Sequence, residues 1–258
     1  MRTNFNIERI DYMSTNEKAR DNPVIGFAQS TSTKKQFQPN QPVTDELLYE
    51  MIAEVFTDFC KGVINEHLPI TEPILKEIID DHFVSNNQEQ TLIQNLFWWQ
   101  ILYQAHLEGG LDVFEEYILG NPVTFKGKPI LKSWLREWKR AVPKFYFVGE
   151  KYSDRLFVVI DILTQELLEV NVYDPAAIPP KEGEIAVGIL IPMGDGLYFP
   201  IIDFYHFDFK ARDALAATLY DHFDKYLQNS SMLEAFIHVL SVALQIEKII
   251  SEERQSSM

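Results

Sequence analysis

The feature that most constrains the fold is a series of five strand-like runs between residues 143 and 205. Each run is short and rich in valine, isoleucine, phenylalanine and tyrosine, which favour β-strands. Turn-forming residues separate the runs, and three prolines make the stretch from Asp174 to Gly183 a loop. The five runs are KFYFVGE, DRLFVVID, ELLEVNVYD, EIAVGILIP and GLYFPIID.

The lengths of the links predict how these strands pair. Short links favour antiparallel neighbours, because a parallel pair needs a crossover of about a dozen residues or more. In the third run Leu168 and Val170 alternate with Glu169 and Asn171, which is typical of a half-buried strand. The sequence therefore predicts an α+β fold, with a small five-stranded antiparallel sheet or partial barrel flanked by N-terminal and C-terminal helices.

Helical spacing of apolar residues lies on both sides of this sheet. Thr44 is expected to cap the first helix, Pro69 to end it and Thr71 to cap the second. The other helices are expected over about 88–107, 111–119, 129–140, 215–226 and 232–249.

The same patterns divide the chain into regions. Residues 1–40 are polar and aperiodic, which predicts a flexible N-terminal tail in which Val24, Ile25 and Phe27 could dock. The remaining regions are a helical region (41–142), an antiparallel β region (143–205) and C-terminal helices (206–250), with 41–250 forming one compact unit.

Composition narrows the classes of function. The formal net charge of −15 argues against general nucleic-acid binding, because an acidic body repels phosphate backbones. Cys60 is the sole cysteine and falls on an apolar helix face, so we expect a buried thiol and no cysteine-rich zinc site.

Location is predicted from what the sequence lacks. There is no long apolar run for a membrane span and no secretory h-region at the start, which predicts a cytoplasmic protein without membrane association. The oligomeric state stays open, because the helical stripes could equally close a dimer interface.

One family resemblance rests on hydrophobic patterns. The segments are LFWWQILYQ, LDVFEEYIL, ILKSWL, RLFVVIDILTQELLEVNVYD and GEIAVGILIPMGDGLYF. Their order resembles the body of bacterial proteins that end in a SEC-C motif, the SecA C-terminal-like zinc motif. The resemblance covers less than half of the chain and implies no activity for this body. The cysteines of the zinc motif are absent, so zinc binding does not carry over.

A basic cluster stands out within the acidic chain. It could bind phosphates or an acidic partner, or it could be a solvated helix face whose exposed ion pairs contribute about 0–1 kcal/mol each. Trp134 and Trp138 lie on the apolar side of the same helix. The basic residues are Lys126, Lys128, Lys132, Arg136, Lys139 and Arg140, with Glu137 the one acid among them.

Histidine and aspartate recur near the C-terminal helices. Asp203, His206 and Asp208 combine residue types that bind zinc, manganese or iron, although their spacing matches no metal motif. The alternative is that Asp203 marks a strand end and Asp208 a helix N-terminus. Asp221, His222 and Asp224 belong to the same candidate constellation. Weaker candidates, each with a structural explanation, are Asp80, Asp81 and His82, and His106 and His238.

These observations favour a non-enzymatic, cytoplasmic, bacterial-type protein-interaction module. The expected binding surface is the sheet or the helix that carries Trp134 and Trp138, with Lys132, Arg136, Lys139 and Arg140 beside them. No cofactor is predicted, because the sequence has no phosphate-loop or dinucleotide motif. The alternatives are a metal-dependent hydrolase using Asp203, His206 and Asp208, and phosphate or nucleic-acid binding through the basic helix.

Overall fold

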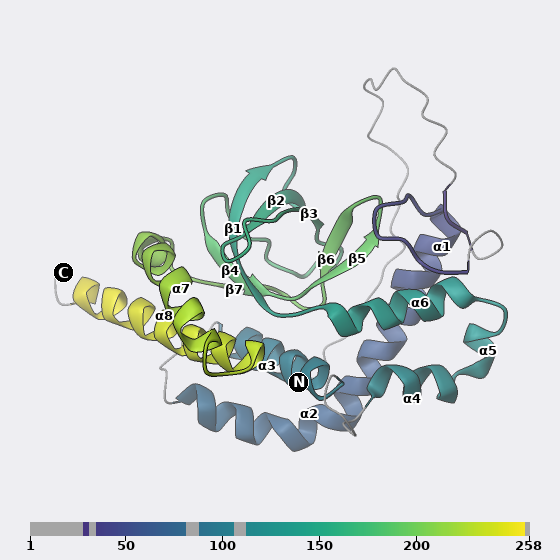
Figure 1. Cartoon of the computed structure of the whole chain (residues 1–258), viewed down its shortest axis with the longest axis horizontal. Helices are drawn as coiled ribbons and strands as arrows, with labels where there is room; N and C mark the ends of the chain where they lie inside the picture. The colour runs from purple at the N-terminus through teal and green to yellow at the C-terminus, as the bar shows by residue number, and fades with distance from the viewer. Residues whose placement is uncertain (1–27, 31–34, 81–87, 106–111, 256–258) are drawn as a thin grey trace.

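The computed structural model describes residues 28–30, 35–80, 88–105 and 112–255. A curled β-sheet lies at the top of Figure 1, and the helices lie below and beside it. Helices from before and after the sheet share one large hydrophobic cluster with it, which extends from Phe37 to Leu244. The α+β class predicted from the sequence is confirmed.

The helices follow the predicted apolar stripes closely. Thr44 caps the first of them as expected, because its hydroxyl accepts a hydrogen bond from the Leu47 amide at 3.3 Å. The helices are α1 (Asp45–Tyr49), a π-helix (Glu50–Phe56), α2 (Thr57–Asp80), α3 (Glu89–Gln104), α4 (Val113–Gly120), α5 (Pro122–Phe125), α6 (Pro129–Glu137), α7 (Arg212–Leu227) and α8 (Met232–Gln255). Short 3-10 helices at Trp138–Arg140 and Phe209–Ala211 follow α6 and precede α7.

The predicted break at Pro69 is wrong. Helix α2 continues through Pro69 and Pro73, and Thr71 lies inside it, where its hydroxyl donates to the His67 carbonyl at 3.2 Å. Leu75, beyond both prolines, is buried in the large cluster. The burial of apolar residues such as Leu75 beyond the prolines therefore outweighs the hydrogen bonds that the prolines remove.

The sheet contains seven strands where five were predicted. Its order is β5-β6-β3-β2-β1-β4-β7. The strands are β1 (Lys144–Lys151), β2 (Leu156–Asp161), β3 (Leu167–Asn171), β4 (Ile185–Gly188), β5 (Leu190–Gly194), β6 (Leu197–Pro200) and β7 (Tyr205–His206).

One of the two extra strands arises because the fourth run divides at Ile189, and the other is β7, which follows the fifth run. Strand β4 pairs with β1, whereas β5 pairs with β6 in another part of the sheet. A Cβ atom on Gly188 would lie 2.7 Å from the Phe204 ring, so this position needs glycine where the chain turns. Because Ile189 alone separates β4 from β5, the sheet must curl until these two regions meet.

The sheet is mixed, which corrects the all-antiparallel prediction. Strands β3 and β6 pair in parallel, with Glu169 opposite Leu197 and Val170 opposite Tyr198. The short links do join antiparallel neighbours, as for β1 with β2 and β2 with β3. The parallel pair is possible because β4 and β5 supply the long crossover that such a pair requires.

Curling gives the sheet two apolar faces. Side chains that alternate along β1 illustrate this, because Tyr146 and Val148 join one cluster while Phe145 joins the other. The inner cluster contains Tyr146, Val148, Phe157, Val159, Leu168, Val170, Ala186, Leu190 and Phe204. The outer face meets the helices through Phe145, Ile185, Val187, Ile191, Met193 and Phe199.

The end of the predicted N-terminal tail packs on the body. Phe37 is 3 % exposed and lies in the large cluster, and Gln29 is fully buried. The Gln29 side-chain amide donates to the carbonyls of Gln38 and Gln41 at 2.7 and 2.8 Å. The expectation of a flexible tail is therefore wrong for residues 28–30 and 35–40, and Val24, Ile25 and Phe27 lie outside the described residues.

Candidate functional site

Trp134 and Trp138 are core residues, not a binding surface. Both are fully buried, and their rings meet edge to face with centroids 5.1 Å apart. The Trp134 indole donates to the Pro192 carbonyl at 2.7 Å, which fastens α6 to β5. Neither tryptophan side chain is exposed in this structure, because the aromatic face of α6 supplies part of the core.

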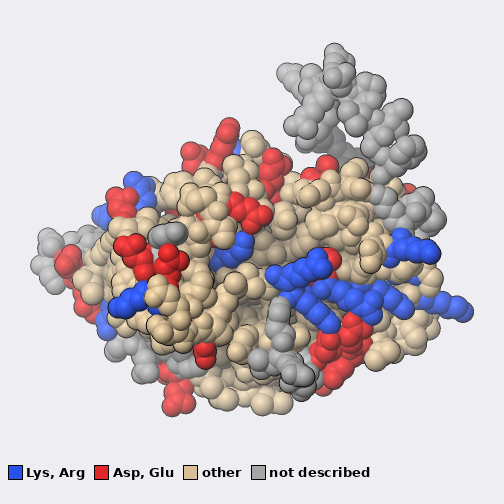
Figure 2. All heavy atoms as spheres, viewed as in Figure 1, with Lys and Arg blue, Asp and Glu red and all other residues tan. Residues whose placement is uncertain are grey.

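The basic side of α6 is largely neutralised by carboxylates. Figure 2 shows it as a band of Lys and Arg with acidic residues beside it. Arg136 makes two hydrogen bonds to Glu115, at 2.6 and 2.8 Å, which lower the pKa of Glu115. The other ion pairs are Lys139 with Asp112 and Glu115, Arg140 with Glu137, and Lys128 with Glu50.

Two cations of this band, Lys126 and Lys132, have no carboxylate within ion-pair distance in the described part of the chain. A phosphate ligand would have to compete with carboxylates for the other four cations. The band therefore fits the solvated, ion-paired helix face that the sequence left as an alternative.

The proposed metal ligands have separate roles. His206 Nδ1 lies 3.2 Å from Glu184 Oε2, and the Asp208 carboxylate accepts from the Lys210 amide at 2.9 Å. Asp208 thus caps the 3-10 helix, as its alternative interpretation predicted. Among the described residues, no group of three or more His, Cys, Asp or Glu could hold a metal ion.

The other candidate residues named from the sequence, where the structure describes them, lie on separate helices. Asp221, His222 and Asp224 lie on α7, and the His238 ring stacks on Tyr226 with centroids 4.7 Å apart. Asp80 is exposed at the end of α2. Asp81, His82 and His106 lie outside the described residues.

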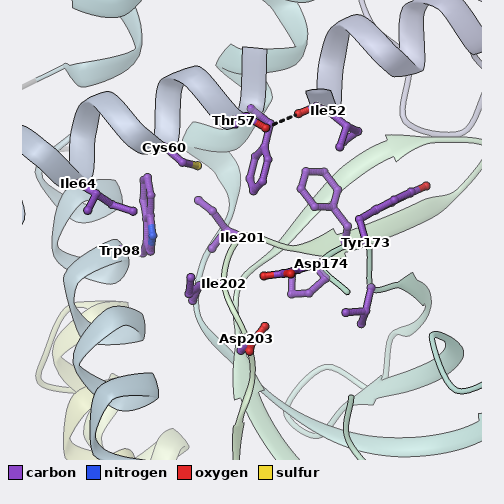
Figure 3. Close-up of a pocket in the computed structure, with 14 residues that line it drawn as sticks. Ile52, Thr57, Cys60, Ile64, Trp98, Tyr173, Asp174, Ile201, Ile202 and Asp203 are labelled. Atoms are coloured by element: carbon purple, nitrogen blue, oxygen red, sulfur yellow. Dashed lines mark hydrogen bonds between the residues drawn. The ribbon is translucent and has the colours of Figure 1, made fainter. Parts of the chain in front are cut away.

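A small cavity lies where the π-helix and α2 approach the end of β6 (Figure 3). It encloses about 70 Å³, and we call it the Asp203 cavity. Thr57 fixes the π-helical turn beside it, because its hydroxyl donates to the Ile52 carbonyl at 3.1 Å. The lining residues are Ile52, Phe56, Thr57, Cys60, Ile64, Trp98, Val172, Tyr173, Asp174, Phe199, Pro200, Ile201, Ile202 and Asp203.

Two carboxylates supply the charge of the Asp203 cavity. Burial and the nearby Asp174 carboxylate raise the pKa of Asp203 from 3.8 to about 6. No lysine or arginine of the described residues makes an ion pair with either aspartate. Burial also raises the pKa of the Cys60 thiol, so that thiol stays protonated and is a poor nucleophile.

A larger cavity lies between β1, α3 and the start of α8. It encloses about 370 Å³ and is walled mainly by apolar side chains, and we call it the α8 cavity. Trp99 and Phe236 line the cavity, and their rings meet edge to face with centroids 4.9 Å apart. The lining residues are Trp99, Leu102, Tyr103, Ala141, Val142, Pro143, Lys144, Asp161, Leu163, Thr164, Phe223, Ser231, Met232, Leu233 and Phe236.

The polar edge of the α8 cavity is an ion-pair network. Lys144 Nζ lies 2.8 Å from Asp161 and 3.1 Å from Glu166. Burial opposes the charges, but the contacts outweigh it, so the pKa of Lys144 is raised and that of Asp161 is lowered. The buried Asp161 also accepts from the Thr164 hydroxyl at 2.6 Å, which fixes the β2–β3 turn.

Sequence reasoning identified Asp203 but not its setting. Asp174 lies 29 positions earlier, in the proline-bearing loop, and no local pattern pairs the two residues. The α8 cavity was also missed, because its walls come from several predicted helices, strands and links that are distant in sequence. The spacing of a stripe predicts which face is buried, but it does not show where the packing leaves a hollow.

Comparisons of the chain with protein-family models, curated proteins and solved structures found no match. The resemblance to the body of SEC-C proteins therefore stays a prediction. In the described ranges no helix is long and apolar enough to cross a membrane.

Proposed function

We propose that this protein is a non-enzymatic interaction module whose binding site is the α8 cavity. The cavity receives one bulky apolar side chain of a partner polypeptide. The observation that carries the proposal is a hollow of about 370 Å³ with apolar walls and one polar edge. Pockets of this size and composition are the usual sites of recognition, and buried apolar anchors supply most of the energy at interfaces.

The rim of the cavity favours a polypeptide partner. Met232 lines the opening and is 54 % exposed, so apolar surface continues outside the cavity. Val142 and Pro143 also line the cavity and are half-buried. Flexible methionine at a rim suits contact with a partner surface, and a partner that covers it gains hydrophobic stabilisation.

Charge selects the residues that flank the anchor. Lys144, Asp161 and Glu166 together carry one net negative charge at the polar edge, and the whole chain carries −15. An acidic partner would be repelled at long range, whereas a basic one would be attracted. The expected partner segment is therefore one apolar anchor with neutral or basic neighbours.

A displayed library of random peptides, selected on the wild-type protein, tests this proposal. The enriched peptides should share one large apolar residue flanked by lysine or arginine. Leu163→Trp adds volume inside the cavity and should weaken these peptides about tenfold or more, equivalent to about 1.4 kcal/mol or more. The matched control is Leu167→Trp, because Leu167 lies on neighbouring β3, is 62 % exposed and does not line the cavity.

Two outcomes would contradict the proposal. One is enrichment of acidic peptides or of peptides without an apolar anchor. The other is equal binding of the selected peptides to Leu163→Trp and Leu167→Trp. Denaturation curves of both variants show whether each is folded under the binding conditions.

A further inference from the structure

The Asp203 cavity places two carboxylates beside an apolar hollow, and neither has an ion-pair partner among the residues that the structure describes. Figure 3 shows Asp174 to the right of Ile201 and Ile202 and Asp203 below them, and both aspartates line the cavity. The Asp174 carboxylate accepts from the Ala176 amide at 2.8 Å, and Asp203 receives a hydrogen bond from the Ile178 backbone. Neither contact supplies a compensating positive charge.

The Arg155 charge lowers the pKa of Asp203 only in part, because burial and Asp174 outweigh it. The Arg155 guanidinium donates to the backbone carbonyls of Asp174 and Pro175, the latter at 2.8 Å, and makes no ion pair with a carboxylate of the described residues. Asp203 is half-buried and Asp174 is exposed, and the Asp174 charge adds to the rise in the pKa of Asp203 because like charges repel each other. A cation placed between Asp174 and Asp203 would relieve this repulsion.

We propose that the Asp203 cavity binds an alkylammonium group. The ammonium lies between the carboxylates of Asp174 and Asp203 and donates hydrogen bonds to both. The short aliphatic chain enters the hollow among Ile52, Phe56 and Ile201. This inference does not rest on the proposed function, because it concerns a different cavity and a different ligand chemistry.

The shape and chemistry of the hollow favour an organic cation over a metal ion. A metal site needs more convergent ligands than two carboxylates, and no such group occurs among the described residues. The walls beyond the two aspartates are mainly isoleucine, phenylalanine and tryptophan. The space of about 70 Å³ exceeds the roughly 10–15 Å³ that one water needs on the same measure, so a few methylene groups fit.

Calorimetric titration with n-butylammonium chloride is the primary test. n-Butanol is the matched neutral probe, because it has the same aliphatic chain and no charge. We expect n-butylammonium to bind at least about tenfold more tightly than n-butanol. Equal binding of the two probes, or no binding of n-butylammonium, would overturn the proposal.

Variants locate the bound ammonium. Asp203→Asn and Asp174→Asn preserve shape and remove one charge each, so each should weaken n-butylammonium about five- to tenfold. Asp195→Asn is the control, because Asp195 lies exposed in the β5–β6 turn away from the cavity. Loss of affinity in the control equal to that in Asp203→Asn would show nonspecific attraction to an acidic protein and overturn the assignment.

A chain-length series in the wild-type protein keeps the proposal testable if a variant does not fold. Affinity should rise from methylammonium to about butylammonium and then level off or fall, because the hollow is small. A continued rise to octylammonium would indicate adsorption to the surface and would overturn the proposal.

An alkylammonium group occurs both in free amines and in lysine side chains. N-acetyl-lysine-methylamide distinguishes these sources, because its backbone groups must remain outside the hollow. Binding within about threefold of n-butylammonium assigns the site to a lysine of a partner, and binding more than tenfold weaker assigns it to free amines.

Discussion

The Asp203 cavity and the α8 cavity differ most in how their carboxylates are compensated. In the α8 cavity the buried Asp161 has a cation, Lys144, at 2.8 Å and a hydroxyl from Thr164. In the Asp203 cavity neither aspartate has an ion-pair partner among the described residues. If both proposals hold, the charge balance at the edge, more than the apolar walls, sets which ligand each cavity accepts.

Of the changes considered, removing the cation of the α8 cavity should change the free energy of unfolding most. Lys144→Met leaves the Asp161 carboxylate, which is 1 % exposed, without its counter-charge. The expected loss is about 3 kcal/mol in the free energy of unfolding, measured by urea denaturation at pH 7. Lys139→Met, which removes a partly exposed ion pair, should cost about 1 kcal/mol or less. Equal losses would mean that Asp161 does not depend on Lys144.

The reverse change at the Asp203 cavity should stabilise the protein. Because the pKa of Asp203 is raised from 3.8 to about 6, the folded state binds its proton more tightly than the unfolded state. This contribution favours folding most below pH about 4 and is lost as the pH rises to about 6. Asp203→Asn should therefore raise the free energy of unfolding at pH 7 by about 1–2 kcal/mol, allowing for partial solvent screening.

The pH dependence provides the control for this prediction. Near pH 3 the Asp203 side chain is neutral in both states, so the variant and the wild-type protein should have similar stabilities. Denaturation curves at pH 3 and pH 7 make the comparison. A variant that is less stable than the wild-type protein at pH 7 would show that the Asp203 charge is compensated after all.

Salt should affect ligand affinity differently at the two cavities, and this effect should be smaller than the changes above. Raising NaCl from 50 to 500 mM should weaken n-butylammonium at the Asp203 cavity about two- to threefold, because ions screen its carboxylates. Binding of a neutral apolar probe such as Nile red at the α8 cavity should be unchanged or slightly stronger. Equal weakening of both probes would remove the proposed distinction.

The fold was predictable where local pattern and packing agree. The helix stripes and the positions of the β runs follow from spacing, and Thr44 and Asp208 act as caps as their positions suggest. The division of the fourth run at Ile189 was not predictable, because its residues read as one continuous strand. It depends on the close approach of the Phe204 ring to Gly188, a tertiary contact.

The candidate sites were less predictable, for related physical reasons. Aromatic residues beside cations suggested a binding surface, but Trp134 and Trp138 are large enough that burial in the core dominates. Asp203 was identified as a candidate ligand, but its neighbours in sequence point to other partners. Its relevant neighbour, Asp174, approaches through the fold, and a sequence pattern does not record such a distance.

Methyl NMR of isoleucine- and leucine-labelled wild-type protein during titration with n-butylammonium chloride tests the central claim most directly. We expect saturable shifts at Ile52, Ile201 and Ile202, with little change at Leu102, Leu163 and Leu233. Shifts confined to the three leucines of the α8 cavity, or equal shifts in both sets, would show that Asp174 and Asp203 do not select the cation.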